Sequence, residues 1–491
     1  SSIPRWRIMR RHLAWPSDFD IEQVKSVFKA YDIRGIFGEA INEQFAYRLG
    51  AALATYLDLN TLVVGRDIRE SSPILHTAFL LGLKESGVHV QDIGIVPTGS
   101  MYHATHVLDV EGGVMITASH NPPKYNGFKM NNGTAAMAGD SIQELLNVFL
   151  NSEFKMGNGS ITNTEILNDH INSVIERLDS PIRNLKVAID CGNAVAGPAM
   201  IQLFKKLNVE TVPLFCDWDN QFPNHAPDPT RIENMQHLAK AVIENNCDFG
   251  IGIDGDGDRV GLVDENGTFI HPDKMLALFA IDLLKKRVGL SEQERTIIFD
   301  VKCSMAVENV IKENGGIPLM LRTGHSFQKQ ALRENPLVPL AGEMSGHIFF
   351  NDNWPGFDDS LYVSARLVEL VSRTLESNER FSDLIGILPV YSSTGEAKVH
   401  FISDDKNALM QSIIDSVNNE GLENSTIDGI RFNFEKEGKV VGWCLCRLSN
   451  TEPIFVMRAE AIDDENLIWI KSEVNRIISP HLDISEFLNQ D

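Results

Sequence analysis

The sequence has little positive charge, few cysteines and no long apolar run. Lys and Arg number 44 against 67 Asp and Glu, and the net charge of −23 predicts no nucleic-acid partner. No apolar run approaches the roughly 18 residues that a membrane span needs, so we expect no membrane partner. The six cysteines form no CxxC pair, and this use of thiols fits a reducing cytoplasm.

Acidic residues are missing before Asp18, a stretch that contains four arginines: Arg5, Arg7, Arg10 and Arg11. This composition is shared with transit peptides, and no signal-peptide core follows it. We favour the alternative interpretation, a disordered N-terminal extension over residues 1–27.

Low-complexity linkers are also missing, so the 491 residues are expected to form several packed domains. Strand-like apolar segments alternate with segments of helical period in three successive blocks, which is typical of α/β domains with parallel sheets. In the last hundred residues, neighbouring strands have few helices between them, and this predicts an α+β domain with an antiparallel sheet. We predict domains over residues 28–165, 166–270, 271–385 and 386–491.

A serine follows the apolar segment VMI in the sequence TASHNPP. Pro122 and Pro123 stop the chain from continuing as a helix or a strand, so Ser119 is presented at the end of a strand. Ser, Asn and Pro are also ordinary turn residues. This segment alone therefore does not distinguish a reactive serine from a turn.

The segment DGDGDR is more specific, because its three carboxylates, Asp254, Asp256 and Asp258, alternate with glycines between two apolar strands. Such carboxylates repel each other unless a cation lies among them, and oxygen ligands favour Mg²⁺ or Ca²⁺. The neighbouring Arg259 suits a phosphate that is bound between the cation and the guanidinium.

The same carboxylates match the first, third and fifth positions of an EF-hand loop, with Glu265 at the twelfth. Two features oppose that alternative. Arg259 occupies the sixth position, where an EF-hand needs glycine, and the flanking segments are strand-like rather than helical.

Two later loops carry groups that bind sugars and phosphates. GEMSGH offers a carboxylate, a hydroxyl and an imidazole, from Glu343, Ser345 and His347. These groups can bind sugar hydroxyls, although an exposed polar turn would have a similar sequence. RLSNTEP offers a set that can hold a phosphate: Arg447, Ser449, Asn450 and Thr451. Further candidates lie in or beside loops that end strands, although each alone is more often a surface charge: Arg34, Lys129, Lys302 and His325.

In chain order, the motifs KAYDIRG, TASHNPPKYNGFKM, DGDGDR, TGHS, GEMSGH and RLSNTEP resemble those of the α-D-phosphohexomutases, of the phosphomannomutase/phosphoglucomutase type. The resemblance runs from about Phe28 to the C-terminus. It implies three topologically related α/β domains and a C-terminal α+β domain around a central cleft.

The resemblance also implies a role for each motif. Ser119 would carry a phosphoryl group and, with Asp254, Asp256 and Asp258, would bind one Mg²⁺ per chain. The other catalytic residues would be Arg259, which neutralises the phosphoryl group, Arg34, and the proton-transfer candidates Lys129 and His325. The substrate would be bound by a sugar set, Tyr31, Lys302, Glu343, Ser345 and His347, and by a distal-phosphate set, Arg447, Ser449, Asn450 and Thr451.

The implied activity is reversible transfer of phosphate between C1 and C6 of hexose phosphates through a hexose 1,6-bisphosphate, which would also be the activator. In the family, the residues that match Glu343 and Ser345 contact O3 and O4. Glucose and mannose differ only at C2, so we expect both to be substrates. We further expect a cytoplasmic monomer whose partner is a hexose phosphate.

Three alternatives stay open. A phosphoglucosamine mutase acts on substrates that also differ at C2. A metal-dependent phosphatase would release the phosphoryl group to water, but it would have no need of the second phosphate site, RLSNTEP. A non-catalytic sugar-phosphate or calcium-binding relative would be expected to have lost motif residues, and here all of them are present.

Overall fold

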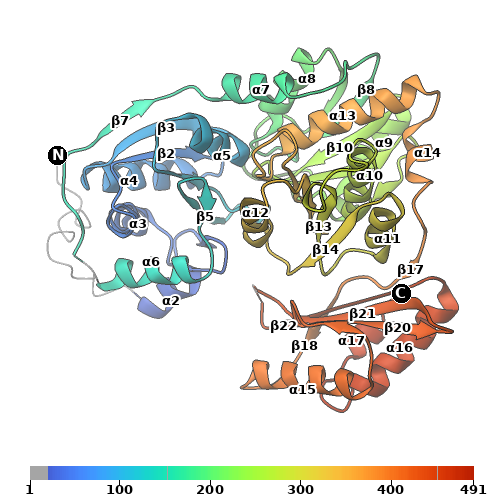
Figure 1. Ribbon diagram of the computed structural model, residues 1–491. Helices are drawn as coiled ribbons and strands as arrows, with labels where there is room; N and C mark the ends of the chain where they lie inside the picture. Colours follow the sequence, from blue (N-terminus) through green and yellow to red (C-terminus); the bar gives the residue numbers. More distant parts are fainter. Residues whose placement is uncertain (1–19, 152, 451, 491) are drawn as a thin grey trace. The chain divides into compact units, whose positions relative to one another are not determined.

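The computed structural model describes residues 20–151, 153–450 and 452–490. It divides into two compact units, which we describe separately. Unit 1 contains the described residues up to Pro272 together with Ser345–Asp383, and unit 2 contains Asp273–Met344 and the described residues from Leu384 onward. The predicted N-terminal extension lies mostly outside the described residues, but its end forms helix α2 (Ile21–Val27), whose N-terminal amides bond to the Asp20 side chain (Figure 1).

Unit 1 begins with a seven-stranded sheet in the order β1-β5-β4-β2-β3-β7, with β6 beside β5. Strands β2, β3 and β4 are parallel, whereas β5 runs antiparallel to both β4 and β1. The strands are β1 (Ile33–Ile36), β2 (Thr61–Arg66), β3 (His89–Ile95), β4 (Gly112–Ile116), β5 (Tyr125–Asn132), β6 (Ala135–Ala136) and β7 (Ser160–Asn163). The helices are α3 (Glu43–Tyr56), α4 (Ser72–Lys84), α5 (Thr98–Val107), α6 (Asp140–Asn151) and α7 (Leu167–Glu176).

Two glycines bring helices α3 and α4 close together. A Cβ on Gly50 would lie 2.5 Å from the carbonyl oxygen of Phe79, and a Cβ on Gly82 would lie 2.1 Å from that of Tyr47. Only glycine permits this approach of two backbones. The result is a dense core against the sheet whose strands β4 and β5 position Ser119 and Lys129.

The second sheet of unit 1 has the order β12-β11-β10-β8-β9. Strands β8, β9 and β10 are parallel, and β11 is antiparallel to β10. The strands are β8 (Lys186–Asp190), β9 (Glu210–Leu214), β10 (Phe249–Ile253), β11 (Val260–Asp264) and β12 (Phe269–Ile270). Around them lie α8 (Gly197–Lys206), η1 (Ile232–Met235) and α9 (Gln236–Glu244), and the later segment adds β16 (Ile348–Phe350) and α13 (Ser360–Glu376).

Unit 2 contains a parallel set of strands in the order β14-β13-β15 and a separate antiparallel sheet. The first set comprises β13 (Thr296–Asp300), β14 (Ile317–Leu321) and β15 (Leu340–Gly342), with α10 (Pro272–Leu284), η2 (Gln293–Arg295), α11 (Met305–Glu313) and α12 (His325–Glu334). The second sheet comprises β17 (Ser392–Ser393), β18 (Ala397–His400), β19 (Asn424–Ser425), β20 (Ile430–Lys436), β21 (Lys439–Leu448) and β22 (Ile454–Ala461). Its helices are α15 (Lys406–Asn419), α16 (Asp464–Ile478) and α17 (Ser485–Leu488), and α14 (Phe381–Ile385) precedes it.

The predicted fold class is confirmed. The parallel strands of the three α/β regions share one order, in which the second strand lies beside the first and the first beside the third: β3-β2-β4, β9-β8-β10 and β14-β13-β15. The last sheet is antiparallel, as the closely spaced strands predict. The four domain boundaries stay predictions.

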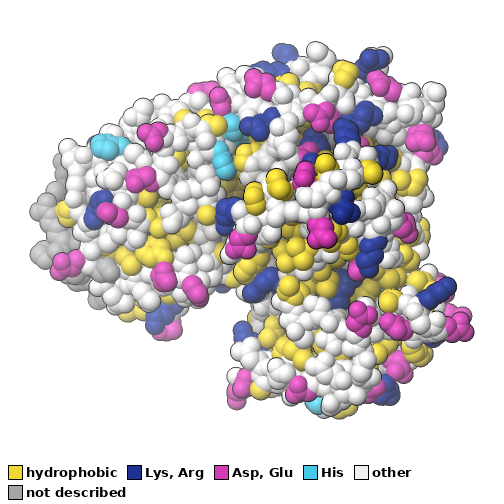
Figure 2. Space-filling model, in the orientation of Figure 1, with side chains coloured by type: hydrophobic (Ala, Val, Ile, Leu, Met, Phe, Trp, Pro, Cys, Tyr) yellow, Lys and Arg dark blue, Asp and Glu magenta, His cyan; other side chains and the backbone are white. Residues whose placement is uncertain are grey.

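The helices, cysteines and surface charges of the structure can be compared with what the composition indicates. None of the described helices combines the length and the apolar character needed to cross a membrane. All six cysteines are free thiols, and Cys444 and Cys446 are buried in β21. Acidic and basic side chains are interspersed on the face drawn in Figure 2, with no large region of one sign.

Candidate active site

The loop after β4 presents Ser119 in a strained backbone conformation. Its φ angle of 53° lies in the left-handed region, which costs a non-glycine residue roughly 1–3 kcal/mol. The buried Arg69 holds the loop, because its guanidinium donates to the carbonyl oxygens of Ser119 at 3.0 Å, Asn121 at 2.8 Å and Pro122 at 2.7 Å. Arg69 lies three residues after the end of β2, and no sequence motif pointed to it.

The DGDGDR loop joins β10 to β11 and is folded around one carboxylate oxygen. Asp254 Oδ1 accepts hydrogen bonds from the backbone N–H groups of Gly257, Asp258 and Arg259 at 3.0, 3.0 and 3.1 Å. The flanking elements are strands, so the EF-hand alternative is wrong. Glu265 does not return to this loop but accepts a hydrogen bond from the backbone N–H of Ser382.

The serine loop and the carboxylate loop meet directly. Ser119 Oγ lies 2.9 Å from Asp256 Oδ1 and 3.4 Å from Asp254 Oδ2. Thr98, the first residue of α5, donates its hydroxyl to Asp256 Oδ2 at 2.7 Å. The structure therefore places the predicted nucleophile beside two of the predicted metal ligands.

The three carboxylates fit a cation. Each of Asp254, Asp256 and Asp258 offers an oxygen within 4.8 Å of the others, and all three side chains are buried. Asp258 Oδ1 is buried and has no hydrogen-bond partner among the described residues. Burial, followed by the charges of Asp258 and Asp256, raises the pKa of Asp254 well above its ordinary value.

Lys129, on β5, is buried against the same carboxylates. Its ammonium group donates to Asp256 Oδ2 at 2.5 Å and to Asp258 Oδ2 at 2.8 Å. Burial opposes its charge, but Asp256 and Asp258 raise the pKa of Lys129 well above its ordinary value. Burial also opposes the charge of Asp258 and by itself would raise the pKa of that carboxyl. The charges of Lys129 and His347 nevertheless hold the pKa of Asp258 well below its usual range.

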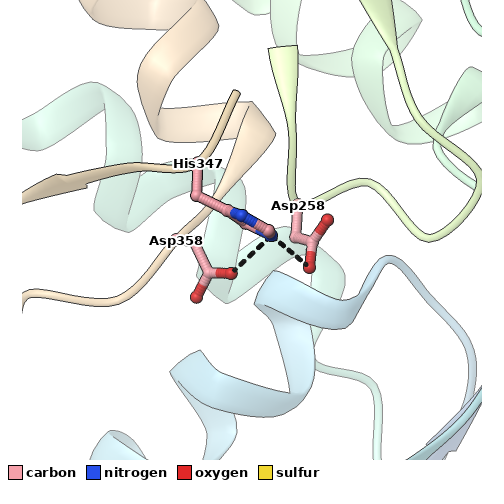
Figure 3. Close-up of side chains that lie close together, drawn as sticks. All are labelled: Asp258, His347 and Asp358. Carbon is pink, nitrogen blue, oxygen red and sulfur yellow. Dashed lines mark ion pairs between the residues drawn. The ribbon is translucent and has the colours of Figure 1, made fainter. Parts of the chain in front are cut away.

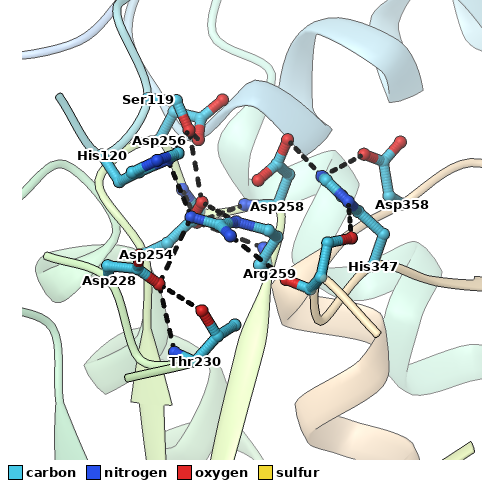
Figure 4. Close-up of polar contacts among 12 residues, drawn as sticks. Ser119, His120, Asp228, Thr230, Asp254, Asp256, Asp258, Arg259, His347 and Asp358 are labelled. Carbon is cyan, nitrogen blue, oxygen red and sulfur yellow. Dashed lines mark hydrogen bonds and ion pairs between the residues drawn. The ribbon is translucent and has the colours of Figure 1, made fainter. Parts of the chain in front are cut away.

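Arg259 is fixed on several sides in the buried region that Figure 4 shows. Its Nε donates to Asp254 Oδ2 at 2.9 Å, and its Nη2 lies 2.8 Å from His120 Nδ1 and 3.6 Å from Asp228 Oδ1. Burial and then the charge of Arg259 lower the pKa of His120 to about 3, so this imidazole is neutral and its Nδ1 accepts. His120 and Asp228 were not predicted as site residues.

His347 lies between two carboxylates (Figure 3). Its Nε2 is 3.5 Å from Asp258 Oδ2 and 3.6 Å from Asp358 Oδ2, and its Nδ1 is 2.8 Å from Ser345 Oγ. Arg34, on β1, pairs with Asp32 and donates to Asn121 Oδ1 at 2.8 Å in the serine loop.

Unit 1 thus contains these predicted residues: Ser119, Lys129, Asp254, Asp256, Asp258, Arg259, Arg34, Ser345 and His347, with Tyr31 half-buried just before β1.

Unit 2 contains the other described candidates. Glu343 accepts a hydrogen bond from the backbone N–H of Gly324 at 2.8 Å, next to His325 at the start of α12. Lys302 follows β13, and its Nζ lies 3.6 Å from Glu396 Oε1. Arg447, on β21, donates from Nε to Asp428 Oδ2 at 2.9 Å, and Ser449 and Asn450 follow that strand. Thr451 lies outside the described residues.

Comparison with known proteins matches this architecture. The chain fits the family models described as phosphoglucomutase/phosphomannomutase, alpha/beta/alpha domain I over residues 25–156, domain II over residues 168–267 and domain III over residues 271–391. A phosphomannomutase/phosphoglucomutase of Pseudomonas aeruginosa is 40% identical over 451 residues, covering 91% of this chain and 94% of that protein. A phosphoglucomutase of Neisseria meningitidis serogroup A is 38% identical over 461 residues, covering 92% of this chain and 97% of that protein.

A solved structure agrees with these relatives. A phosphoglucomutase/phosphomannomutase family protein of Burkholderia thailandensis has a TM-score of 0.86 and 39% identity, covering 94% of this chain and 99% of that chain.

The chain belongs to the phosphoglucomutase/phosphomannomutase family. It is an enzyme of the phosphotransferase type, a hexose phosphate mutase of a metal-dependent family, and its acidic cluster could bind the metal. The family resemblance and the mutase activity predicted from the motifs are confirmed.

Proposed function

We propose that this enzyme transfers phosphate reversibly between C1 and C6 of both glucose and mannose phosphates through a phosphorylated Ser119. The observation that carries the proposal is the position of Ser119 Oγ, 2.9 Å from Asp256 Oδ1 and 3.4 Å from Asp254 Oδ2, beside the buried Arg259. A nucleophile placed beside cation ligands and a guanidinium suits phosphoryl transfer, in which the enzyme mainly positions groups and stabilises charge.

Two transfers complete the reaction. A free hydroxyl of the hexose phosphate attacks phosphorus on phosphorylated Ser119, so the new O–P bond forms as the bond to Ser119 Oγ breaks and the hydroxyl proton passes to a base. The resulting hexose 1,6-bisphosphate turns around, and Ser119 Oγ attacks its other phosphoryl group. The bond from phosphorus to the sugar oxygen then breaks, and that oxygen takes up the proton. Lys129 and His325 are the proposed proton-transfer groups, with Arg34 as the further catalytic residue.

Asp254, Asp256, Asp258 and Ser119 would hold one Mg²⁺ per chain. When bound, this ion would neutralise the carboxylates and the charge that develops on the transferred phosphoryl group. The buried Asp258 Oδ1, which has no hydrogen-bond partner among the described residues, supports this ligand set. Hexose 1,6-bisphosphate would be the activator because it phosphorylates Ser119. A monomeric state and a cytoplasmic location stay predictions.

The remaining site residues are assigned to the substrate. Arg447, Ser449, Asn450 and Thr451 would hold the phosphate that does not react. A buried N–H group supports this, since Arg447 Nη2 has no hydrogen-bond partner in the described parts of the chain. The sugar would be bound by Tyr31, Lys302, Glu343, Ser345 and His347.

The test compares conversion of glucose 1-phosphate and mannose 1-phosphate to their 6-phosphates, with Mg²⁺ and catalytic glucose 1,6-bisphosphate, in wild type and Ser119→Ala. Turnover of both sugars that is lost in Ser119→Ala supports the proposal, and Ser472→Ala, at an exposed position on α16, is the matched control. Release of inorganic phosphate would point to a phosphatase instead. Turnover of glucosamine phosphate alone would point to a phosphoglucosamine mutase.

Dual specificity gives a prediction for Glu343. If this residue binds the hydroxyls at C3 and C4, which glucose and mannose share, Glu343→Ala should lower kcat/KM for both sugars by a similar factor. A charged hydrogen bond of this kind is worth about 1.5–3 kcal/mol, so the loss should be roughly 10- to 100-fold. Parallel steady-state assays check this, and a loss confined to one sugar would show that the two are bound differently.

A further inference from the structure

Asp428 is a partly buried carboxylate that no sequence motif identified. It precedes β20, and its Oδ2 accepts two hydrogen bonds, from Arg447 Nε at 2.9 Å and from the backbone N–H of Thr323 at 2.9 Å. The side chains of Arg447 and Asp428 are 4% and 10% exposed. One oxygen atom therefore joins the end of β21 to the TGHS loop that precedes α12.

We propose that Asp428 is a positioning residue, which holds Arg447 in register with the loop that carries His325. This inference rests on the proposed function, because that function assigns Arg447 to the non-reacting phosphate of the substrate. The Asp428 oxygen that is placed by these contacts is bonded to the protein itself, to Arg447 Nε and to the N–H of Thr323. Asp428 acts by fixing where the guanidinium lies and by tying that position to a second loop of the site.

The state of Arg447 supports this role. Its Nε is bound by Asp428, and its Nη2 is buried without a hydrogen-bond partner among the described residues. A buried donor without a partner is costly, and an anion that accepts from it removes the cost. Because the bond from Nε to Asp428 fixes the plane of the guanidinium, the neighbouring Nη2 group keeps one orientation for a phosphate oxygen.

The backbone after Asp428 is fixed against the strand that carries Arg447. Gly429 has a φ angle of 64°, and a Cβ there would lie 2.3 Å from the carbonyl oxygen of Cys446 and 2.6 Å from Arg447 Cα. Only glycine allows this contact. Asp428 therefore projects from a backbone whose distance to Arg447 is set by direct contact.

A second carboxylate, the buried Asp300, extends the connection to the sugar loop. Thr323 Oγ1 donates to Asp300 Oδ2 at 3.0 Å, and the backbone N–H of Met344 donates to Asp300 Oδ1 at 3.0 Å. Glu343, next to Met344, accepts from the N–H of Gly324 at 2.8 Å. Asp428 and Asp300 thus link three loops in unit 2, and they set the spacing between the phosphate arginine and Glu343. A mutase has to reuse one spacing for a substrate that binds in two orientations.

Asp428→Asn tests the inference, because the amide keeps an oxygen for the N–H of Thr323 but loses the charge that pairs with Arg447. We expect KM for both glucose 1-phosphate and mannose 1-phosphate to rise about 10- to 100-fold, with a smaller change in kcat. Calorimetric binding of glucose 1-phosphate should weaken by the same factor. Glu420→Gln, which breaks an exposed pair with Arg476 in the same unit, should leave both quantities unchanged.

A double-mutant cycle separates positioning from general stability. If Asp428 acts through Arg447, Asp428→Asn should cause almost no further loss of binding in an Arg447→Ala background. If the double variant instead loses binding by the product of the two single-variant factors, the inference is overturned. A normal KM in Asp428→Asn would also overturn it. If Asp428→Asn does not fold, Asp428→Ser replaces it in the same cycle. Wild type that binds glucose 1-phosphate without turnover would overturn the proposed function alone, and wild type that does not bind it would overturn both.

Discussion

Gly255 allows the carboxylate loop to lie directly against the backbone of Ser119. A Cβ at this position would lie 1.8 Å from the carbonyl oxygen of Ser119 and 2.7 Å from its carbonyl carbon. The φ angle of Gly255 is not positive, so alanine would be compatible with the local backbone conformation. The requirement for glycine at this position comes from the contact between the loops alone.

Gly255→Ala should therefore displace Ser119 from Asp256 and lower kcat by about 100-fold, the loss expected for a shift of about 1 Å in a reacting group. Steady-state kinetics with glucose 1-phosphate measure this. The matched control is Gly395→Ala, whose Cβ would meet only the flexible side-chain end of Gln490, at 3.0 Å. Wild-type kcat in Gly255→Ala would show that the loops do not need this contact.

At this scale, the sequence predicts the reactive groups better than the residues that hold them. Asp254, Asp256 and Asp258 are recognisable because their spacing has few other uses. The sequence around Arg69 and around Asp228 has no distinctive pattern. The roles of these two residues arise only from contacts with residues far away in the chain. A single sequence contains no signal for such contacts.

Helix α5 links the site to a group of buried histidines. Its first residue, Thr98, holds Asp256, while His103 lies against α7, with its ring stacked on His170 at 5.0 Å between centroids. The Nε2 atom of His103 is 2.6 Å from Asp169 Oδ1. Burial, and then the neighbouring His170, lower the pKa of His103 despite that carboxylate.

This shift predicts how stability depends on pH. A histidine whose pKa is lower in the folded than in the unfolded chain takes up a proton more readily on unfolding, so its contribution is complete above the unfolded pKa of about 6.5 and is lost as the pH falls below it. His103→Gln should reduce the loss of unfolding free energy between pH 8 and pH 5, as measured by urea titration. At pH 8 the histidine is neutral, so the difference in unfolding free energy between wild type and His103→Gln at this pH measures the effect of the substitution on packing. An unchanged slope would show that His103 does not titrate on unfolding in this range.

At the scale of elements, most strands and helices follow from their patterns. The alternating segments before residue 386 become parallel sheets, and GIRFNF, GWCLCRLSN and PIFVMRAEA become β20, β21 and β22. Helix α13 was not predicted. Its apolar residues recur at a helical period, and its side chains, polar ones included, are buried over almost its whole length.

For the whole molecule, the division into two compact units bears on metal binding. All three proposed carboxylate ligands and Ser119 lie in unit 1, whereas the described residues assigned to the distal phosphate, Arg447, Ser449 and Asn450, lie in unit 2. The GEMSGH loop is divided between the units, because the boundary falls between Met344 and Ser345. Residues of one sequence motif therefore belong to different units, and the sequence alone could not predict this.

Mg²⁺ without sugar should consequently stabilise unit 1 and leave unit 2 nearly unchanged. A ligand at 100 times its dissociation constant stabilises the folded state by ~2.7 kcal/mol, which should raise the unfolding temperature of unit 1 by about 5 °C. Calorimetry measures this shift, and hydrogen exchange on peptides from each unit assigns it. Asp258→Asn, which replaces a proposed ligand, should abolish the shift. Equal stabilisation of both units would mean that they unfold together, and a shift that persists in Asp258→Asn would place the ion elsewhere.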